Sequence, residues 1–174
     1  MMNDEILFSE QQRFTQWWLW AILISVNGMM IYYGYEQIFL QKQVGTEPAG
    51  STGLLIGIGV TLTVTVLIFF LRLDTRITKE GIDVRLYPLH ATTRHYSWDN
   101  IDKALVRKYS PIKEYGGWGI RQGGFGAGKA YNISGNQGIQ LVFSNGGKLL
   151  IGTAHPQEVA RILAGVELAK PDLF

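Results

Sequence analysis

The chain has 174 residues, which leaves room for one small domain and a membrane element, and it contains no cysteine. Disulfides, thiolate metal sites and a cysteine nucleophile are therefore excluded. Residues 1–71 carry two basic and five acidic side chains, whereas residues 72–174 carry 14 and nine. This modest, scattered positive charge fits a position beside an anionic membrane face and lacks the clustered Lys and Arg that nucleic-acid binding calls for.

Residues 1–16 are mainly polar, with a few apolar positions. A secretory signal would begin with basic residues and end at a small-residue cleavage site. This acidic start matches neither feature, so we interpret the segment as an uncleaved juxtamembrane lead-in.

Residues 17–35 are the first of two predicted membrane-spanning helices. Three Trp stand at one end of this segment and three Tyr at the other: Trp17, Trp18, Trp20, Tyr32, Tyr33 and Tyr35. The outermost pair is about 27 Å apart at 1.5 Å per residue, close to the thickness of a hydrocarbon core. Aromatic belts of this kind are typical of spanning helices. We favour an interhelical hydrogen bond for the central Asn27 over a transport role.

Residues 53–71 contain no charged side chain, and a helix of this length spans a bilayer. The alternation of β-branched residues at 60–66 would also suit a strand, so a buried core helix or strand remains the alternative. As a helix, the segment presents a ridge of small side chains that favours close helix packing, formed by Gly53, Gly57, Thr61 and Thr65.

The connection between the two predicted spans, residues 36–52, is expected to be an extracytoplasmic loop. It offers only Lys42, whereas Arg72, Arg76 and Lys79 follow the second span. Basic residues flank the cytoplasmic ends of spans. We therefore expect a multi-pass protein of the cell (inner) membrane with both termini in the cytoplasm.

Residues 72–174 form the predicted cytoplasmic domain, in which short β-like segments alternate with turn residues. Asn145 followed by Gly146 is a strong hairpin signal, because both central residues of a type I′ turn need positive φ. Pro156 then begins a helix with one apolar stripe, Val159, Ile162, Leu163 and Val166. Strands are predicted at residues 73–78, 82–87, 92–98, 103–109, 117–121, 129–134, 139–143 and 148–153.

Seven or eight short antiparallel strands closed by one C-terminal amphipathic helix resemble the pleckstrin-homology (PH) fold. Two membrane helices followed directly by this pattern resemble the bacterial PH-like membrane proteins, a family of unknown function. The matching pieces are residues 75–78, 81–82, 96–101 and 149–153. The resemblance covers most of residues 17–166 and implies a PH-like β-barrel or sandwich. Phosphoinositide-binding PH domains end their basic pattern in Arg, and Tyr87 stands at that position here.

Residues 123–130 match the spacing of a P-loop up to Lys129 and then depart from it. A P-loop needs a Ser or Thr after the Lys and a following helix, but Ala130 has no hydroxyl and a strand pattern continues. We interpret this segment as a glycine-rich hairpin tip, with nucleotide binding as the weaker alternative.

The stretch around Trp118 alternates glycines with a large aromatic residue, which is typical of a sharply bent strand. With the glycine-rich loop it could form a partner-facing or lipid-facing rim, consisting of Tyr115, Trp118, Arg121 and Lys129. The alternative is a barrel corner in which Trp118 fills the core.

Catalytic and metal-binding patterns do not emerge from the sequence. His90, His95 and His155 are scattered, without carboxylates at metal-ligand spacing, and no Ser lies in a nucleophile elbow. We expect no enzyme activity and no cofactor.

The sequence therefore predicts a membrane-anchored PH-like binding or scaffold module. Its expected partner is a membrane protein, an anionic lipid headgroup or a second copy of the chain. The alternative is an accessory subunit of a transporter or secretion complex, with Asn27 and the small-residue ridge as its docking face.

Overall fold

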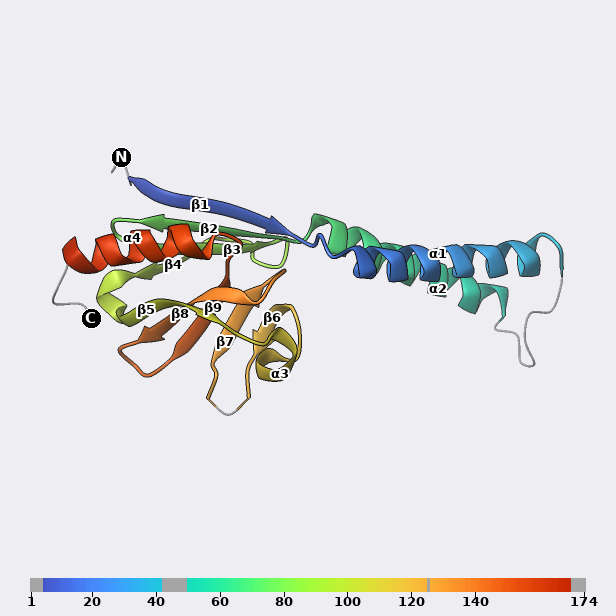
Figure 1. Cartoon of the computed structure of the whole chain (residues 1–174). Helices are drawn as coiled ribbons and strands as arrows, with labels where there is room; N and C mark the ends of the chain where they lie inside the picture. The colour runs from blue at the N-terminus through green and yellow to red at the C-terminus, as the bar shows by residue number, and fades with distance from the viewer. Residues whose placement is uncertain (1–4, 42–49, 125, 170–174) are drawn as a thin grey trace. The chain divides into compact units, whose positions relative to one another are not determined.

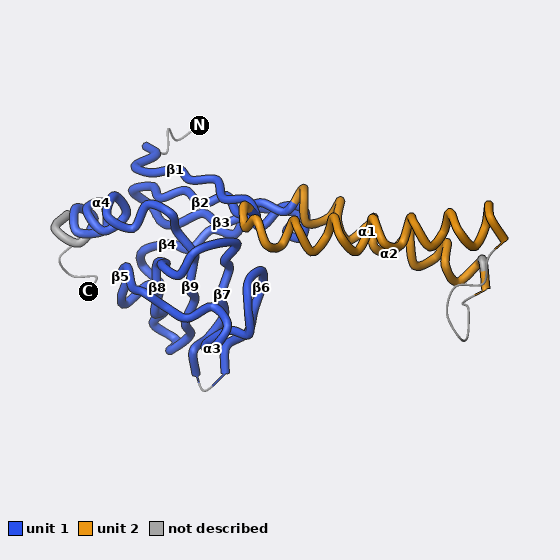
Figure 2. The backbone as a smooth tube through the Cα atoms, turned by 45° about the vertical axis from the view of Figure 1, so that its right-hand side comes forward, with its two compact units in different colours: residues 1–14, 71–174 blue, residues 15–70 orange. Residues whose placement is uncertain are grey.

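The computed structural model describes residues 5–41, 50–124 and 126–169 (Figure 1). The chain divides into two compact units (Figure 2). One unit is helical and comprises Thr15–Phe70; the other is rich in β-sheet and combines Met1–Phe14 with Leu71–Phe174. The sheet-rich unit is thus assembled from both ends of the sequence.

The helical unit consists of α1 (Trp17–Ile38) and α2 (Ser51–Phe70), which pack against each other. Trp20, near the start of α1, makes an edge-to-face contact with Phe69, near the end of α2, at 6.2 Å between ring centroids. The pair is therefore antiparallel. Both predicted helices are confirmed as helices, and the strand alternative for residues 53–71 is wrong.

Among the described residues, one helix is long and apolar enough to cross a membrane by length and composition. It is Thr52–Phe70, with a mean hydropathy of 2.4 and none of its most apolar window buried. The terminal aromatic residues of α1 and its central Asn27 lower the hydropathy of that helix. A crossing by α1 remains a prediction.

The first sheet is antiparallel throughout and has the order β1-β2-β3-β4. Its strands are β1 (Ile6–Arg13), β2 (Arg72–Thr78), β3 (Gly81–Tyr87) and β4 (Arg94–Ser97). A single 3-10 turn, η1 (Trp98–Asn100), then leads into the second sheet.

The second sheet has the order β5-β8-β9-β7-β6 and is antiparallel except between β7 and β9. Its strands are β5 (Ile101–Lys108), β6 (Gly119–Gln122), β7 (Lys129–Asn132), β8 (Gln137–Phe143) and β9 (Lys148–Gly152). Two helices complete the unit, α3 (Pro111–Tyr115) and α4 (Pro156–Ala169).

All eight strands predicted between residues 73 and 153 are confirmed, with small differences at their ends. The barrel part of the fold prediction is corrected: within the described residues the two sheets remain separate. β4 and β6 are edge strands, and the chain passes from β4 through η1 into the other sheet instead of closing the first one.

The core lies between the sheets and is centred on Trp98, which is fully buried and donates its indole N–H to Thr78 O at 3.0 Å. Ser97 caps this turn by accepting from Asp99 N. Full burial of a large apolar side chain in this core contributes about 1.5–3 kcal/mol. The predicted stripe on α4 is also largely buried, through Val159, Leu163 and Val166. The largest fully buried aliphatic side chains are Leu73, Ile77, Ile82, Leu86, Ile101, Ile133, Ile139, Leu141, Leu150 and Ile151.

β1 was not anticipated, and it revises the interpretation of residues 1–16 as a lead-in outside the domain. It pairs with β2 in antiparallel register up to Arg13 opposite Arg72. Its inward-facing side chains are Phe8, Glu10 and Gln12, of which only the first is apolar. The alternation that marks a half-buried strand is therefore absent from its hydropathy pattern.

The buried polar side chains of β1 bond to the connection between β9 and α4. Glu10, which is 7% exposed, accepts from Thr153 Oγ1 and from Ala154 N, each at 2.7 Å. Gln12 Nε2 donates to Gly152 O at 2.7 Å. Hydrogen bonds to a charged group contribute about 1.5–3 kcal/mol each, so these contacts are a substantial part of what holds β1 in the unit.

Replacing Glu10 by Ala should destabilise the sheet-rich unit by about 2–4 kcal/mol, because two buried donors lose their acceptor. Thermal unfolding of the full-length protein in detergent, with circular dichroism near 215 nm as readout, measures this loss. Ser9→Ala, on the exposed face of the same strand, is the matched control and should leave the transition unchanged. Equal transitions for both variants would contradict the role assigned to Glu10.

Candidate functional site

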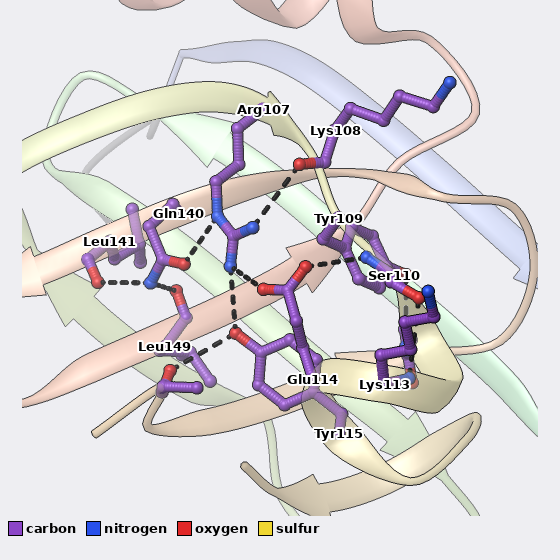
Figure 3. A network of polar contacts seen from close by, with 12 residues as sticks. Arg107, Lys108, Tyr109, Ser110, Lys113, Glu114, Tyr115, Gln140, Leu141 and Leu149 are labelled. Carbon is purple, nitrogen blue, oxygen red and sulfur yellow. Dashed lines mark hydrogen bonds and ion pairs between the residues drawn. The ribbon is translucent and has the colours of Figure 1, made fainter. Parts of the chain in front are cut away.

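A network of charged side chains links α3 to two strands of the second sheet (Figure 3). Arg107 on β5 donates from Nε to Gln140 Oε1 at 3.0 Å and from Nη2 to Glu114 Oε2 at 2.8 Å. Glu114 also accepts from Ser110 N at 2.7 Å. The hydrogen bond from Arg107 holds the pKa of the Glu114 carboxyl below its usual value. One ion pair thereby fixes the position of α3 on the sheet.

Tyr115, at the end of α3, supports the glycine-rich loop between β6 and β7. Its hydroxyl donates to Ala127 O at 3.2 Å and accepts from Arg107 at the same distance. A Cβ at Gly123 would lie 2.9 Å from the Tyr115 ring, and one at Gly128 would lie 2.2 Å from Lys148 O. Glycine at both positions therefore lets the loop approach the ring and the start of β9 closely.

A cleft of about 410 Å³ opens where β4, the β6–β7 hairpin and the β8–β9 hairpin meet. A second depression of about 440 Å³ shares Tyr96, Phe143 and Asn145 with it and continues along β4. The cleft is lined by Arg94, Tyr96, Gln122, Gly128, Lys129, Tyr131, Phe143, Asn145, Gly147, Lys148 and Leu149.

Every charged residue that lines this cleft is a cation: Arg94, Lys129 and Lys148. Within the part of the chain that the structure describes, no carboxylate forms an ion pair with any of the three. Opposite charges that would neutralise them are thus missing from the lining. A concave surface with charge of one sign concentrates ligands of the other sign.

The floor of the cleft is aromatic and uncharged. Burial, and then a hydrogen bond with Tyr131, raise the pKa of Tyr96 to about 12, so its hydroxyl remains a donor at neutral pH. His90 lies behind Tyr131 in edge-to-face contact at 5.1 Å and is 7% exposed. Burial and the charge of Arg94 lower the pKa of His90, so its Nδ1 accepts from Leu86 N at 3.2 Å as neutral imidazole. The cleft therefore offers cations at its rim and neutral donors on its floor, an arrangement suited to holding an anionic group.

The four residues predicted to form a rim lie on α3, directly before β6 and on the β6–β7 hairpin, and they differ in exposure. Lys129 lines the cleft. Trp118 is partly buried and donates Nε1–H to Gly135 O at 3.4 Å, and the exposed Arg121 donates from Nε to Trp118 O at 2.8 Å. Tyr115 is 3% exposed and acts beneath the loop. Arg94 and Lys148 were not singled out, because they come from strands that are distant from Lys129 in sequence.

The predicted packing face of the helical unit is partly buried between the helices. Asn27 Nδ2 donates to Thr65 Oγ1 at 2.8 Å, which is the interhelical hydrogen bond favoured from sequence. Gly57 and Thr61 are half-buried, whereas Gly53 is exposed. Gly34 was missed, although a Cβ there would lie 2.9 Å from Ile58 Cδ1.

No cluster of three or more His, Asp or Glu that could hold a metal ion occurs among the described residues. Lys129 and Ala130 begin β7, so a strand follows the glycine-rich loop where a P-loop would have a helix. No protein-family model matches the chain, and a search of curated proteins also finds no match. The functional interpretation therefore rests on the geometry of the described residues.

Tyr115→Phe should loosen the glycine-rich loop while keeping the ring in place. Losing the hydroxyl removes two hydrogen bonds of about 1 kcal/mol each, so the amides of Gly123 and Ala127 should exchange roughly tenfold faster or more. Hydrogen–deuterium exchange with mass spectrometry measures this, and Tyr87→Phe on the other sheet is the control. Unchanged protection in the Tyr115 variant would contradict the support assigned to the hydroxyl.

The lowered pKa of His90 predicts a loss of stability on the acid side. Its contribution is fully present above the ordinary value of 6.5 and is lost as the pH falls through the lower folded value, because the unfolded chain binds the proton more readily. The thermal midpoint should therefore fall less between pH 7.5 and 5.5 in His90→Gln than in the native chain. His155→Gln, an exposed position, should behave as the native chain does; a native-like response of His90→Gln would contradict this prediction.

Proposed function

We propose that this protein is a membrane-anchored, non-enzymatic binding module with a PH-like domain, and that its cleft receives an acidic segment of a membrane-protein partner. The observation that carries the proposal is the uniformly positive lining formed by Arg94, Lys129 and Lys148. No metal-binding cluster accompanies these cations in the described part of the chain. Three cations that line one cleft are suited to binding a negatively charged ligand.

Membrane anchoring is supported by the apolar segment Thr52–Phe70. β1 precedes the two helices and β2 follows them, yet the two strands are hydrogen-bonded to each other. Paired strands lie on the same side of a bilayer, so the chain between them crosses an even number of times. If α2 spans the membrane, α1 spans it as well, despite its lower hydropathy.

The orientation follows from the basic residues beyond α2. Arg72 and Arg76 lie on β2, and Lys79 follows it, which favours a cytoplasmic sheet-rich unit. Leu71 alone separates α2 from β2. A linker this short would keep the start of β2 close to the membrane surface, where the cytoplasmic segments of other membrane proteins begin.

An extended segment is the ligand shape that the cleft favours. The two depressions follow one another along β4, which has β3 as its only strand partner among the described residues. A free strand edge can pair with the backbone of an extended peptide, and neighbouring side-chain pockets then provide specificity. Acidic side chains on such a peptide would reach the three cations.

The accessory-subunit alternative depends on the small-residue ridge as an external docking face. Asn27 and Thr65 bond to each other, and Gly57 is half-buried in the same helix pair. Because the ridge already packs α1 on α2, we favour the cleft over the ridge as the partner-binding surface.

Binding of a fluorescein-labelled octaglutamate peptide to the full-length protein in mild detergent tests the proposal by fluorescence anisotropy. The triple variant R94Q/K129Q/K148Q should bind about tenfold more weakly, given up to about 1 kcal/mol for each exposed charge pair. The matched control K103Q/K108Q/R161Q removes the same net charge at exposed positions outside the cleft. Equal losses in both triple variants would show that net charge, and not the cleft, binds the peptide, and would overturn the proposal.

A further inference from the structure

The end of the first sheet that connects to the helices carries a row of basic and aromatic side chains. Arg13 on β1 pairs with Arg72 on β2, which in turn pairs with Tyr87 on β3. Directly paired residues in a sheet point to the same face. The three side chains therefore stand side by side on the outer face of this sheet, and the row contains no acidic residue.

Arg85 lies on β3 two residues before Tyr87 and points to the same face, opposite Asp74 on β2. The guanidinium carbons of Arg72 and Arg85 lie 5.0 Å and 5.5 Å from the centroid of the Tyr87 ring. One aromatic ring thus holds two cations in place. We call Arg13, Arg72, Arg85 and Tyr87 the Arg–Tyr cluster.

Two carboxylates, Asp74 and Asp83, line the same hollow as Arg72 and Arg85. Asp74 Oδ2 is 3.3 Å from Arg72 Nε, and Asp83 Oδ1 is 2.7 Å from His95 Nδ1. Arg76 lines this hollow as well, so with Arg13 the face carries four Arg against two Asp, a net charge of +2. Arg85 Nε donates to His90 O at 3.4 Å. Each planar guanidinium carries a fork of N–H donors, which suits phosphate oxygens.

Apolar side chains at the same end of the sheet are exposed. Tyr87 is 37% exposed, and Leu89, in the turn that follows β3, is 52% exposed. Arginine, tyrosine and an exposed aliphatic residue together are typical of the interface between water and lipid.

The position of the cluster along the chain indicates that its ligand is a lipid headgroup. Arg72 is two residues after Phe70, the last residue of the apolar segment, and Arg13 is four residues before Trp17, where α1 begins. Residues this near to a membrane span lie within reach of lipid headgroups. Of the surfaces on this chain, the cluster is therefore the one that chain connectivity keeps at the bilayer.

We propose that the Arg–Tyr cluster binds the phosphate of an anionic phospholipid headgroup, with the guanidinium groups of Arg72 and Arg85 as the fork and Arg13 as an additional cation. This inference rests on the membrane anchoring in the proposed function and is independent of the peptide cleft. The headgroup fixes this end of the sheet at the membrane surface.

Native mass spectrometry of the full-length protein from micelles containing equimolar phosphatidylglycerol and phosphatidylcholine tests the proposal. The native chain should retain phosphatidylglycerol preferentially. R13Q and R85Q should each lower the ratio of retained phosphatidylglycerol to phosphatidylcholine by about fivefold, on the scale of one basic residue at an anionic surface. R161Q, at an exposed position on α4 and away from the hollow that Arg72 and Arg85 line, is the matched control and should keep the native ratio.

Two further outcomes separate this inference from the proposed function. A native chain without lipid preference, or an R161Q variant that loses as much preference as R85Q, overturns the cluster as a lipid site. Alkaline carbonate extraction of membranes tests anchoring separately: a protein released by carbonate contradicts the anchoring itself. Thermal unfolding of R13Q and R85Q at the native midpoint confirms that a lost preference reflects the removed charge and not a misfolded sheet.

Discussion

The hydrogen-bonded pairing of β1 with β2 is the constraint on which the rest of this structure depends. β1 comes before the helical unit in sequence and β2 comes after it, so the sheet cannot form until both helices have been made. The pairing also brings the two connections to the helices side by side, at Arg13 and Arg72. Any membrane crossing by one helix must then be matched by a return through the other, because a sheet cannot be hydrogen-bonded across a bilayer. If α2 crosses a membrane, the pairing of β1 with β2 therefore constrains the topology as much as hydropathy does.

The strands between residues 73 and 153 could be predicted because their apolar alternation and turn residues are local signals. β1 could not, because its inward face carries Glu10 and Gln12, and their acceptors and donors lie about 140 residues away on the β9–α4 connection. A buried carboxylate is predictable only when its partners are known. The barrel prediction was wrong for a related reason: which strands end as sheet edges depends on long-range pairing, which no local pattern records.

The candidate site shows the same difference between local sequence signals and contacts that form only in the folded chain. Lys129 was recognised beside the glycine-rich loop, but Arg94 and Lys148 join it only through the arrangement of β4, β7 and β9. Tyr115 was expected at a rim because it begins the glycine-rich stretch around Trp118; its ring is buried, and its hydroxyl donates to Ala127 O in the loop. In the helical unit, spacing alone identified Asn27 and Thr65, and they are hydrogen-bonded to each other. Helix periodicity places residues on a face reliably, whereas a cleft built from several strands requires the fold.

The topology of the chain in the membrane is the most direct test of the proposed anchoring. Because the chain contains no cysteine, a maleimide can react only with a cysteine that is introduced. Single cysteines introduced at Ser9 on β1, at Gly50 before α2 and at Asn145 between β8 and β9 can each be labelled with a membrane-impermeant maleimide. The account predicts labelling of Gly50→Cys in intact cells, and labelling of Ser9→Cys and Asn145→Cys only after the membrane is permeabilised. Labelling of Ser9→Cys and Asn145→Cys from opposite sides, or of all three from the same side, would contradict it.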